Sequence, residues 1–197
     1  MTLGLIELVL TILASRVVDR ETNYPIYLSL YLAMGLPWLF ASYYVVRQAS
    51  DSTAKRGFVL VFVLALVMRL PFLATEPILS DDIFRYVWDG RVQHAGINPY
   101  LYAPDAEQLV FLRNDLYPRI NNKDIPTIYP PAMEWVFYVA IAISESLWFM
   151  KALFVLCDLA LILVLSGILR ALGLNPVRAV IYAWSPLVIV EVAGSGH

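Results

Sequence analysis

Two adjacent acidic residues, Asp81 and Asp82, begin the polar stretch SDDIFRYVWDGRVQHAGINPY at 80–100, a few residues after the apolar run 58–74. Neighbouring carboxylates can act as a general base that takes a proton from a hydroxyl group, or as ligands for a hard divalent cation. The structural alternative is that both residues cap a helix and that Asp81 pairs with Arg85, four residues further on. The pair alone does not decide between these roles.

The stretch 80–100 has the pattern of a short helix that would display these carboxylates. Ser80 can cap its amino terminus, and the helix dipole favours acidic residues in the first turn. Five residues recur at helical spacing and would share one face of this helix: Ile83, Tyr86, Val87, Gly90 and His94. We predict that this face lies on a membrane surface. We expect the helix to stop at Gly96 and the chain to turn at Asn98-Pro99.

The composition places these residues in an integral membrane protein. Of the 197 residues, 60% are hydrophobic and 15% are charged, and the mean hydropathy is +0.68. These values are typical of proteins in contact with a lipid bilayer. The net charge of -2 shows no basic excess and excludes nucleic acid as a partner.

Six apolar runs predict an all-α fold with about six transmembrane or re-entrant helices. They cover 3–18, 26–46, 58–74, 132–149 with a polar break at 144–146, 152–169 and 179–193. The first run is short and carries Glu7, and the last contains Pro186 in its middle, which makes it a candidate re-entrant segment. The chain thus divides into amino-terminal helices at 1–74, a hydrophilic loop at 75–130, and an incomplete helix bundle at 131–197.

The long hydrophilic loop is predicted to lie outside the cytoplasm. The linker 47–57 holds Arg47, Lys55 and Arg56 against Asp51, and an excess of basic residues marks the cytoplasmic side. The run 58–74 would then leave the cytoplasm and deliver Asp81 to the opposite surface. If the segments after Pro131 cross the membrane alternately, Arg170 and Arg178 also lie outside, against the rule that basic residues mark the cytoplasmic side. The topology of the last segments therefore stays open.

Two acids within apolar runs suggest a different class of function. Asp158 and Glu191 would each cost about 2.5–3.5 kcal/mol at the centre of a spanning helix, so both should face the bundle interior. A transporter, flippase or membrane scaffold would use such residues, with the hydrophilic loop as a lid or docking surface.

Three blocks of sequence resemble a known family. They are the stretch 80–100, DIPTIYPP at 124–131, and YAWSPLVIVEVAGSGH at 182–197. Together, and in this order, they resemble the GT-C superfamily of integral membrane glycosyltransferases. The nearest likeness is to bacterial polyprenyl-phosphate-mannose-dependent mannosyltransferases and to their relatives in GPI-anchor glycan assembly.

The resemblance implies a transferase of the bacterial cytoplasmic membrane whose extracytoplasmic loop carries the catalytic acid. A hexose, most simply mannose, would move with inversion from a polyprenyl phosphate to a glycan or lipid acceptor. Asp81 or Asp82 would be the general base, and no cofactor is required, although the pair could hold Mg²⁺ or Mn²⁺. Further substrate-binding candidates are Arg85, Arg91, His94, Tyr129, Glu191 and His197. Members of the family are longer, so the chain resembles their amino-terminal portion. By this resemblance we expect it to form only part of the groove that binds the donor lipid.

Overall fold

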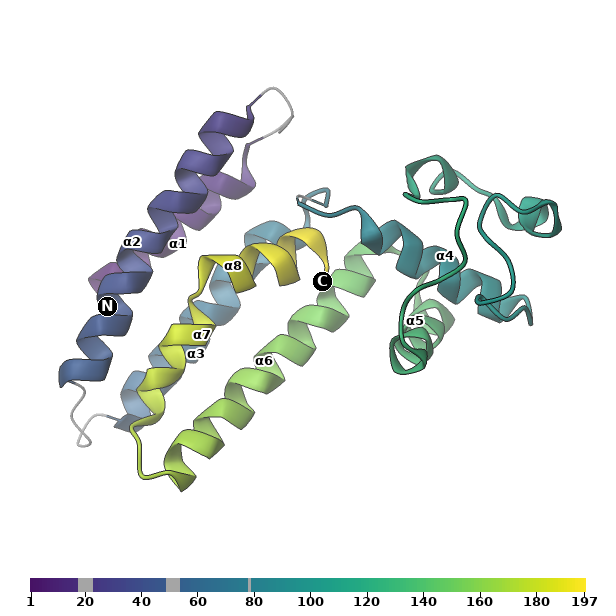
Figure 1. The fold of residues 1–197 in the computed structure, drawn as a ribbon. Helices are drawn as coiled ribbons and strands as arrows, with labels where there is room; N and C mark the ends of the chain where they lie inside the picture. Colours follow the sequence, from purple (N-terminus) through teal and green to yellow (C-terminus); the bar gives the residue numbers. More distant parts are fainter. Residues whose placement is uncertain (18–22, 49–53, 78) are drawn as a thin grey trace.

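The computed structural model describes residues 1–17, 23–48, 54–77 and 79–197, which form helices and connecting loops without a strand in those ranges (Figure 1). Three helices are long and apolar enough to cross a bilayer: α2 (Tyr24–Gln48), α3 (Ala54–Leu73) and α6 (Leu147–Ala171). Helices satisfy every backbone polar group within the lipid, which is why apolar runs of this length adopt them. The predicted all-α membrane fold is confirmed.

Six spans are not confirmed. Helices α1 (Thr2–Ser15) and α5 (Pro131–Ile143) have 14 and 13 residues, well short of the roughly 20 that cross a bilayer. Between α5 and α6 the polar break is real, because Ser146 caps α6 by accepting from the Phe149 amide. The part of the chain that the structure describes therefore holds three spanning helices, or four if one bent pair near the carboxyl terminus is counted.

That bent pair agrees with the predicted interruption at Pro186. The segments Pro176–Ala183 and Pro186–Ser195 meet at 57°, as in a broken span or a re-entrant loop. The first contains η4 (Pro176–Ala179) and α7 (Val180–Ala183), and the second contains α8 (Pro186–Val188) and η5 (Ile189–Ser195), which is a π-helix. Residues 49–53 of the linker used to assign the cytoplasmic side lie outside the described residues.

A buried ion pair joins helices α3 and α6 of the bundle. Arg69 of α3 is fully buried and pairs with Asp158 of α6, which also accepts a hydrogen bond of 2.7 Å from the Tyr182 hydroxyl of α7. Arg69 additionally donates to the carbonyl oxygens of Ala65 and Ala183. Removing one member of such a pair would leave an uncompensated charge in the interior. Asp158 thus joins three elements of the bundle.

Helices α4 (Asp82–His94) and α5 form a second packed unit beside the bundle (Figure 1). The loop between them carries two short 3₁₀ helices, η2 (Glu107–Leu112) and η3 (Tyr117–Arg119). The carboxyl terminus lies where the unit and the bundle meet, so the first and last blocks of the sequence approach each other there.

The prediction that one face of α4 lies on the membrane is wrong. Tyr86 stacks on Phe137 of α5 with ring centroids 4.5 Å apart, and a Cβ on Gly90 would stand 2.8 Å from the Phe137 carbonyl oxygen. Phe84 and Trp88, outside that face, are buried as well. The helix is enclosed because apolar side chains occur around its whole circumference. It ends at His94, close to the predicted stop, and Gly96 adopts a φ of 75°.

Candidate active site

The two aspartates stand side by side at the start of α4. The helix begins at Asp82, and the Ser80 hydroxyl accepts a hydrogen bond of 3.2 Å from the Asp82 amide. The side-chain nitrogen of Asn121, on the loop that follows η3, donates to Asp81 at 2.6 Å and to Asp82 at 2.7 Å. A carboxamide has two N–H groups, one for each carboxylate. Asn121 therefore bridges the two carboxylates.

Asn121 was not foreseen from the sequence. Its only visible signal is the Asn121-Asn122 dipeptide, which is typical of a turn, and Asn122 indeed has a φ of 43°. The contact that matters joins residues about forty positions apart, and no local pattern encodes that distance.

His197 is brought to the aspartates from the far end of the chain. Its Nε2 atom lies 2.7 Å from the Ser80 hydroxyl and 3.5 Å from an oxygen of Asp82. The π-helix η5 makes this possible, because the Glu191 carbonyl accepts from the amides of both Gly196 and His197. Such helices are rare and often occur at functional sites.

The same junction is closed by Ser195 and Gly196. The Leu79 amide donates to the Ser195 hydroxyl at 3.2 Å. Gly196 has a φ of 82°, and a Cβ there would stand 2.6 Å from Ile83. Glycine is thus required both by the backbone conformation and by the close approach. The block ending at His197 and the block beginning at Ser80, separate in sequence, form one site.

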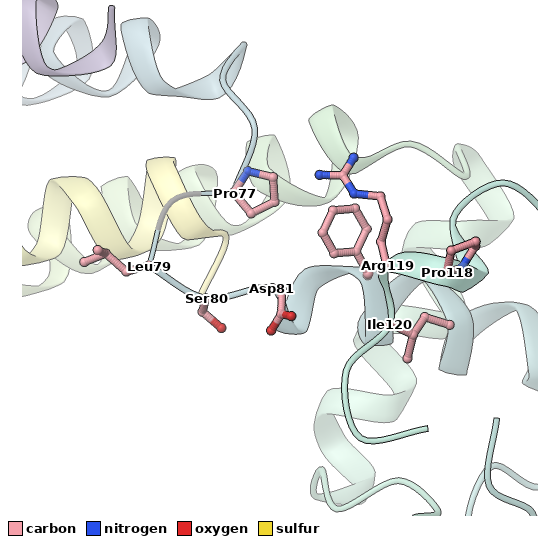
Figure 2. A pocket seen from close by; sticks show the side chains of 8 residues that line it. Pro77, Leu79, Ser80, Asp81, Pro118, Arg119 and Ile120 are labelled. Carbon is pink, nitrogen blue, oxygen red and sulfur yellow. The ribbon is translucent and has the colours of Figure 1, made fainter. Parts of the chain in front are cut away.

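An open cavity of about 660 Å³ lies beside Asp81 (Figure 2). Its lining combines the connection between α3 and α4 with the loop around η3, and consists of Pro77, Leu79, Ser80, Asp81, Phe84, Pro118, Arg119 and Ile120. The Arg119 guanidinium lies over the Phe84 ring, 4.1 Å from its centroid, and donates to Glu76 at 2.5 Å. In Figure 2 the carboxylate of Asp81 and the guanidinium of Arg119 lie well apart and point in different directions. Arg119 is one of five basic residues in the loop, and nothing in its spacing singled it out.

Three predicted cationic residues make other contacts. Arg85 is buried, pairs with Asp89 at 2.9 Å, and donates to the carbonyl oxygens of Asn122 and Ile125. It thereby supports the loop that carries Asn121. The structural alternative of an Asp81–Arg85 pair is wrong, because Asp81 precedes the helix and Asp89 lies one turn after Arg85.

Arg91 and His94 lie further along α4. Arg91 donates to Glu145 at 2.5 Å and to the Leu112 carbonyl at 2.9 Å. The His94 ring stacks on Tyr138 at a centroid distance of 4.2 Å, at the opposite end of α4 from Asp82. The structure does not gather these two residues with the aspartates, and a role in substrate binding stays a prediction.

Tyr129 lies close to the aspartates in a smaller cavity of about 160 Å³ that Asp82 and Asn121 also line. It packs edge-on against Tyr86, with ring centroids 4.9 Å apart. Burial, followed by the neighbouring Tyr86 and Asp82, raises the pKa of Tyr129, and burial and Asp82 raise the pKa of Tyr86 to about 12. Both phenols therefore stay protonated near neutral pH and can donate hydrogen bonds but cannot act as the base.

Residues 6–197 match the family described as alpha-(1->6)-mannopyranosyltransferase, N-terminal domain. This chain belongs to that family. The match supports glycosyltransferase activity in a membrane protein, and it agrees with the predicted likeness to the amino-terminal portion of a mannosyltransferase. No curated protein and no solved structure matched the chain.

The two acids that a transporter would use have different surroundings in the structure. Asp158 forms the ion pair with Arg69 that joins α3 and α6. Glu191 is half-buried in η5, where its backbone carbonyl positions His197. The family match favours the enzyme over a transporter, flippase or scaffold.

The residues near Asp81 and Asp82 do not form a complete binding site for a metal ion. Among the described residues, no three or more His, Cys, Asp or Glu side chains gather in a way that could hold one. One oxygen of each aspartate already accepts from Asn121. Mg²⁺ prefers about six oxygen ligands, so most of them would have to come from substrate or water.

Proposed function

We propose that this protein transfers mannose from a polyprenyl phosphate to a hydroxyl group of an extracytoplasmic glycan or lipid, with Asp81 as general base. The observation that carries the proposal is the cavity that Asp81 and Arg119 share. A carboxylate and a guanidinium standing apart in one open space suit a reaction in which a hydroxyl loses a proton while a phosphate leaves. The family match supports the mannosyl part of the proposal.

The reaction follows from these two groups. Asp81 accepts the proton of the acceptor hydroxyl while that oxygen attacks the anomeric carbon of mannose. The bond between this carbon and the phosphate oxygen breaks, the configuration inverts, and the polyprenyl phosphate leaves with the electron pair. Arg119 stabilises the negative charge on the leaving phosphate. The proton on Asp81 then passes to solvent.

Asp81 is the better base of the pair on geometry. It lines the larger cavity, whereas Asp82 lines the smaller one and lies 3.5 Å from His197. We assign Asp82 the role of holding His197, whose Nε2 atom lies 2.7 Å from the hydroxyl of Ser80, a residue that lines the larger cavity. Asn121 fixes the orientation of both carboxylates.

A polyprenyl donor suits the place of this cavity in the fold. The connection that carries Asp81 directly follows α3, and α6 begins nearby. Both helices are long enough to span the bilayer. An isoprenoid chain lying among the lipids beside them could present its phosphate at their ends. The proposed topology, in which the basic linker 47–57 is cytoplasmic, puts the cavity on the extracytoplasmic side.

The test uses the complete protein in proteoliposomes with polyprenyl-phosphate [¹⁴C]mannose and α-(1→6)-mannosides as acceptors. The wild type should transfer label, Asp81→Asn should lose at least about a hundredfold in rate, and Asp115→Asn should behave like the wild type. Asp115 is a matched control, since it is an exposed carboxylate of the same loop. Near-normal transfer by Asp81→Asn would refute the role of Asp81, and transfer of a different hexose in preference would refute mannose.

A further inference from the structure

A second cavity, of about 520 Å³, lies at the other end of α4, and we name it the α4–α5 cavity. Its principal side chains are Gln93, Asn98, Tyr100, Glu134, Trp135 and Tyr138. None of the chemistry assigned to Asp81 uses these residues. Their types are a carboxyl group, two carboxamides, two phenols and an indole, on a surface that is open to solvent.

Such a lining suits the ring of a sugar. Small-molecule sites combine aromatic surfaces with a few fixed polar groups that set orientation. The Trp135 side chain is 67% exposed, so its indole is available to the C–H face of a pyranose. Carboxyl and carboxamide oxygens are acceptors for sugar hydroxyl groups.

The polar groups of this cavity are held in place before any ligand arrives. The Glu134 carboxyl is almost fully buried and accepts from the Thr127 hydroxyl at 2.7 Å and from the Gln93 carboxamide at 2.8 Å. The Tyr100 hydroxyl donates to the Tyr129 carbonyl at 2.6 Å. In the described part of the chain, the Gln93 carboxamide oxygen has no protein donor and stays available. Preorganised groups of this kind lower the entropic cost of binding.

The charge of the lining distinguishes between the two substrates of the proposed reaction. The donor carries an anionic phosphate, which a carboxyl group would repel. None of the residues described as lining the α4–α5 cavity is Lys or Arg. A neutral glycan fits this environment, whereas the cavity beside Asp81 holds the guanidinium of Arg119.

The length of α4 shows which part of a glycan would lie here. Gln93 follows Asp82 by eleven residues, a helical rise of about 16 Å. This distance is longer than one pyranose ring, so a sugar in the α4–α5 cavity cannot be the sugar that reacts at Asp81. A sugar several units back along an oligosaccharide chain could reach it.

We propose that the α4–α5 cavity is an acceptor subsite that binds a hexopyranose unit of an oligosaccharide, several sugars away from the hydroxyl group that receives mannose. The proposal rests on the proposed function for its identification as an acceptor site. It gives the enzyme a preference for long acceptors over short ones. Trp135 supplies the stacking surface, and the carboxamide oxygen of Gln93, held in place by Glu134, accepts from a ring hydroxyl group.

The first test measures transfer by the complete protein in proteoliposomes to a series of α-(1→6)-linked acceptors, from mannose to mannohexaose. Trp135→Ala should raise KM for the long acceptors about tenfold, equivalent to about 1.4 kcal/mol, and leave KM for mannose and for the donor unchanged. Trp135→Phe should restore part of the difference. Trp148→Ala is the matched control, because Trp148 is also exposed but lies outside the cavity. An equal effect on all acceptors, or none, would overturn the subsite.

A binding measurement separates this inference from the proposed reaction. The Asp81→Asn protein should still bind mannohexaose, detected by quenching of tryptophan fluorescence, and Trp135→Ala in that background should remove the quenching. If binding depends on Trp135 while the wild-type protein transfers no mannose, the sugar site is kept and the proposed reaction is refuted. If phospholipid vesicles quench Trp135 and mannohexaose does not, the cavity binds lipid and the inference is wrong.

Discussion

Helix α4 is associated with two acidic pairs whose surroundings differ. Asp81 and Asp82 stand at its amino terminus, where Asp81 is exposed and the Asp82 side chain is 30% exposed. Asp89, further along the helix, and Glu134 of α5 are 1% and 3% exposed. Among the residues that the structure describes, Asn121 and His197 contact the carboxylates of the first pair, which lines two cavities. The second is surrounded by Arg85, Thr127 and Gln93.

The difference teaches that burial and existing partners, rather than residue type, decide what a carboxylate can do. Burial raises the pKa of Asp89, with Arg85 opposing it, and burial followed by Asp89 raises the pKa of Glu134 to about 7. Both groups are tied into the packing of α4 on α5. The open pair keeps room for a substrate, whereas the buried pair builds the support beneath it.

The sharpest test exchanges one member of each pair for asparagine. Asp81→Asn should lower kcat by about 10²–10⁴ without changing the melting temperature in detergent. Asp89→Asn should instead destabilise the protein by about 3 kcal/mol, because Arg85 would be left as an unpaired buried charge. Transfer assays and thermal melts on both variants measure the two effects. Loss of stability in Asp81→Asn with full stability in Asp89→Asn would reverse the comparison.

Substitution of Arg119 tests whether a phosphate-binding residue acts together with Asp81 and Asp82. Arg119→Ala should raise KM for the polyprenyl-phosphate donor about tenfold or more, since a hydrogen bond to a charged group contributes about 1.5–3 kcal/mol. KM for the acceptor should not change. Arg113→Ala is the control, because Arg113 also stacks on an aromatic ring, Tyr117, but does not line the cavity. An equal rise in donor KM for both variants would mean that Arg119 has no special role.

Gly90 tests the packing that buries the second pair. A Cβ at this position would stand 2.5 Å from a side-chain carbon of Ile141 and 2.8 Å from the Phe137 carbonyl oxygen. Gly90→Ala should therefore destabilise the α4–α5 unit by about 1–3 kcal/mol. Gly167→Ala in α6 is the control, since a Cβ there meets open space and should be neutral or slightly stabilising. Equal melting temperatures for the two variants would show that α4 and α5 are not packed so closely.

The smallest effect concerns pH and Glu134. Its pKa is raised from 4.5 to about 7, so the folded protein binds this proton more tightly than the unfolded chain does. Stability should then fall as the pH rises through the window from about 4.5 to about 7. Glu134→Gln should reduce this slope in melts between pH 5 and pH 8.

Other charged groups around Glu134 determine how much of the pH dependence of stability remains in the Glu134→Gln variant. The charged groups that face it are Asp89 and Arg85 of α4, with Thr127 and Gln93 as its hydrogen-bond donors. Asp89, whose pKa is also raised, acts with the same sign, so the slope should shrink rather than disappear. An unchanged slope would place the titrating group elsewhere.

Local pattern predicted the class of fold, and the resemblance of three blocks named three residues that the structure brings close together. Composition and apolar runs gave the membrane class, Pro186 marked the bent pair, and Asp81, Asp82 and His197 were identified through the three blocks. The predicted number of spans was wrong because the runs at 3–18 and 132–149 were each counted as a membrane segment, whereas α1 and α5 are too short to cross.

The remaining residues of the site depend on contacts between distant positions. Asn121 reaches the aspartates across about forty residues, and Arg119 joins them only because η3 folds against the start of α4. Arg85 was expected to face a substrate, but its partner Asp89 and two loop carbonyls surround it. Neither charge nor spacing along the chain predicts which of several loop cations a fold will bring to a cavity.

The pair between Arg69 and Asp158 has a consequence for biogenesis. Arg69 lies on α3 and its partner on α6, 89 residues later, so during synthesis the arginine enters the lipid before the aspartate has left the ribosome. An isolated charge within the bilayer costs up to about 2.5–3.5 kcal/mol on insertion scales, the value at the helix centre. The nascent α3 should therefore remain beside the translocon, or beside another polar helix, until α6 arrives and neutralises it.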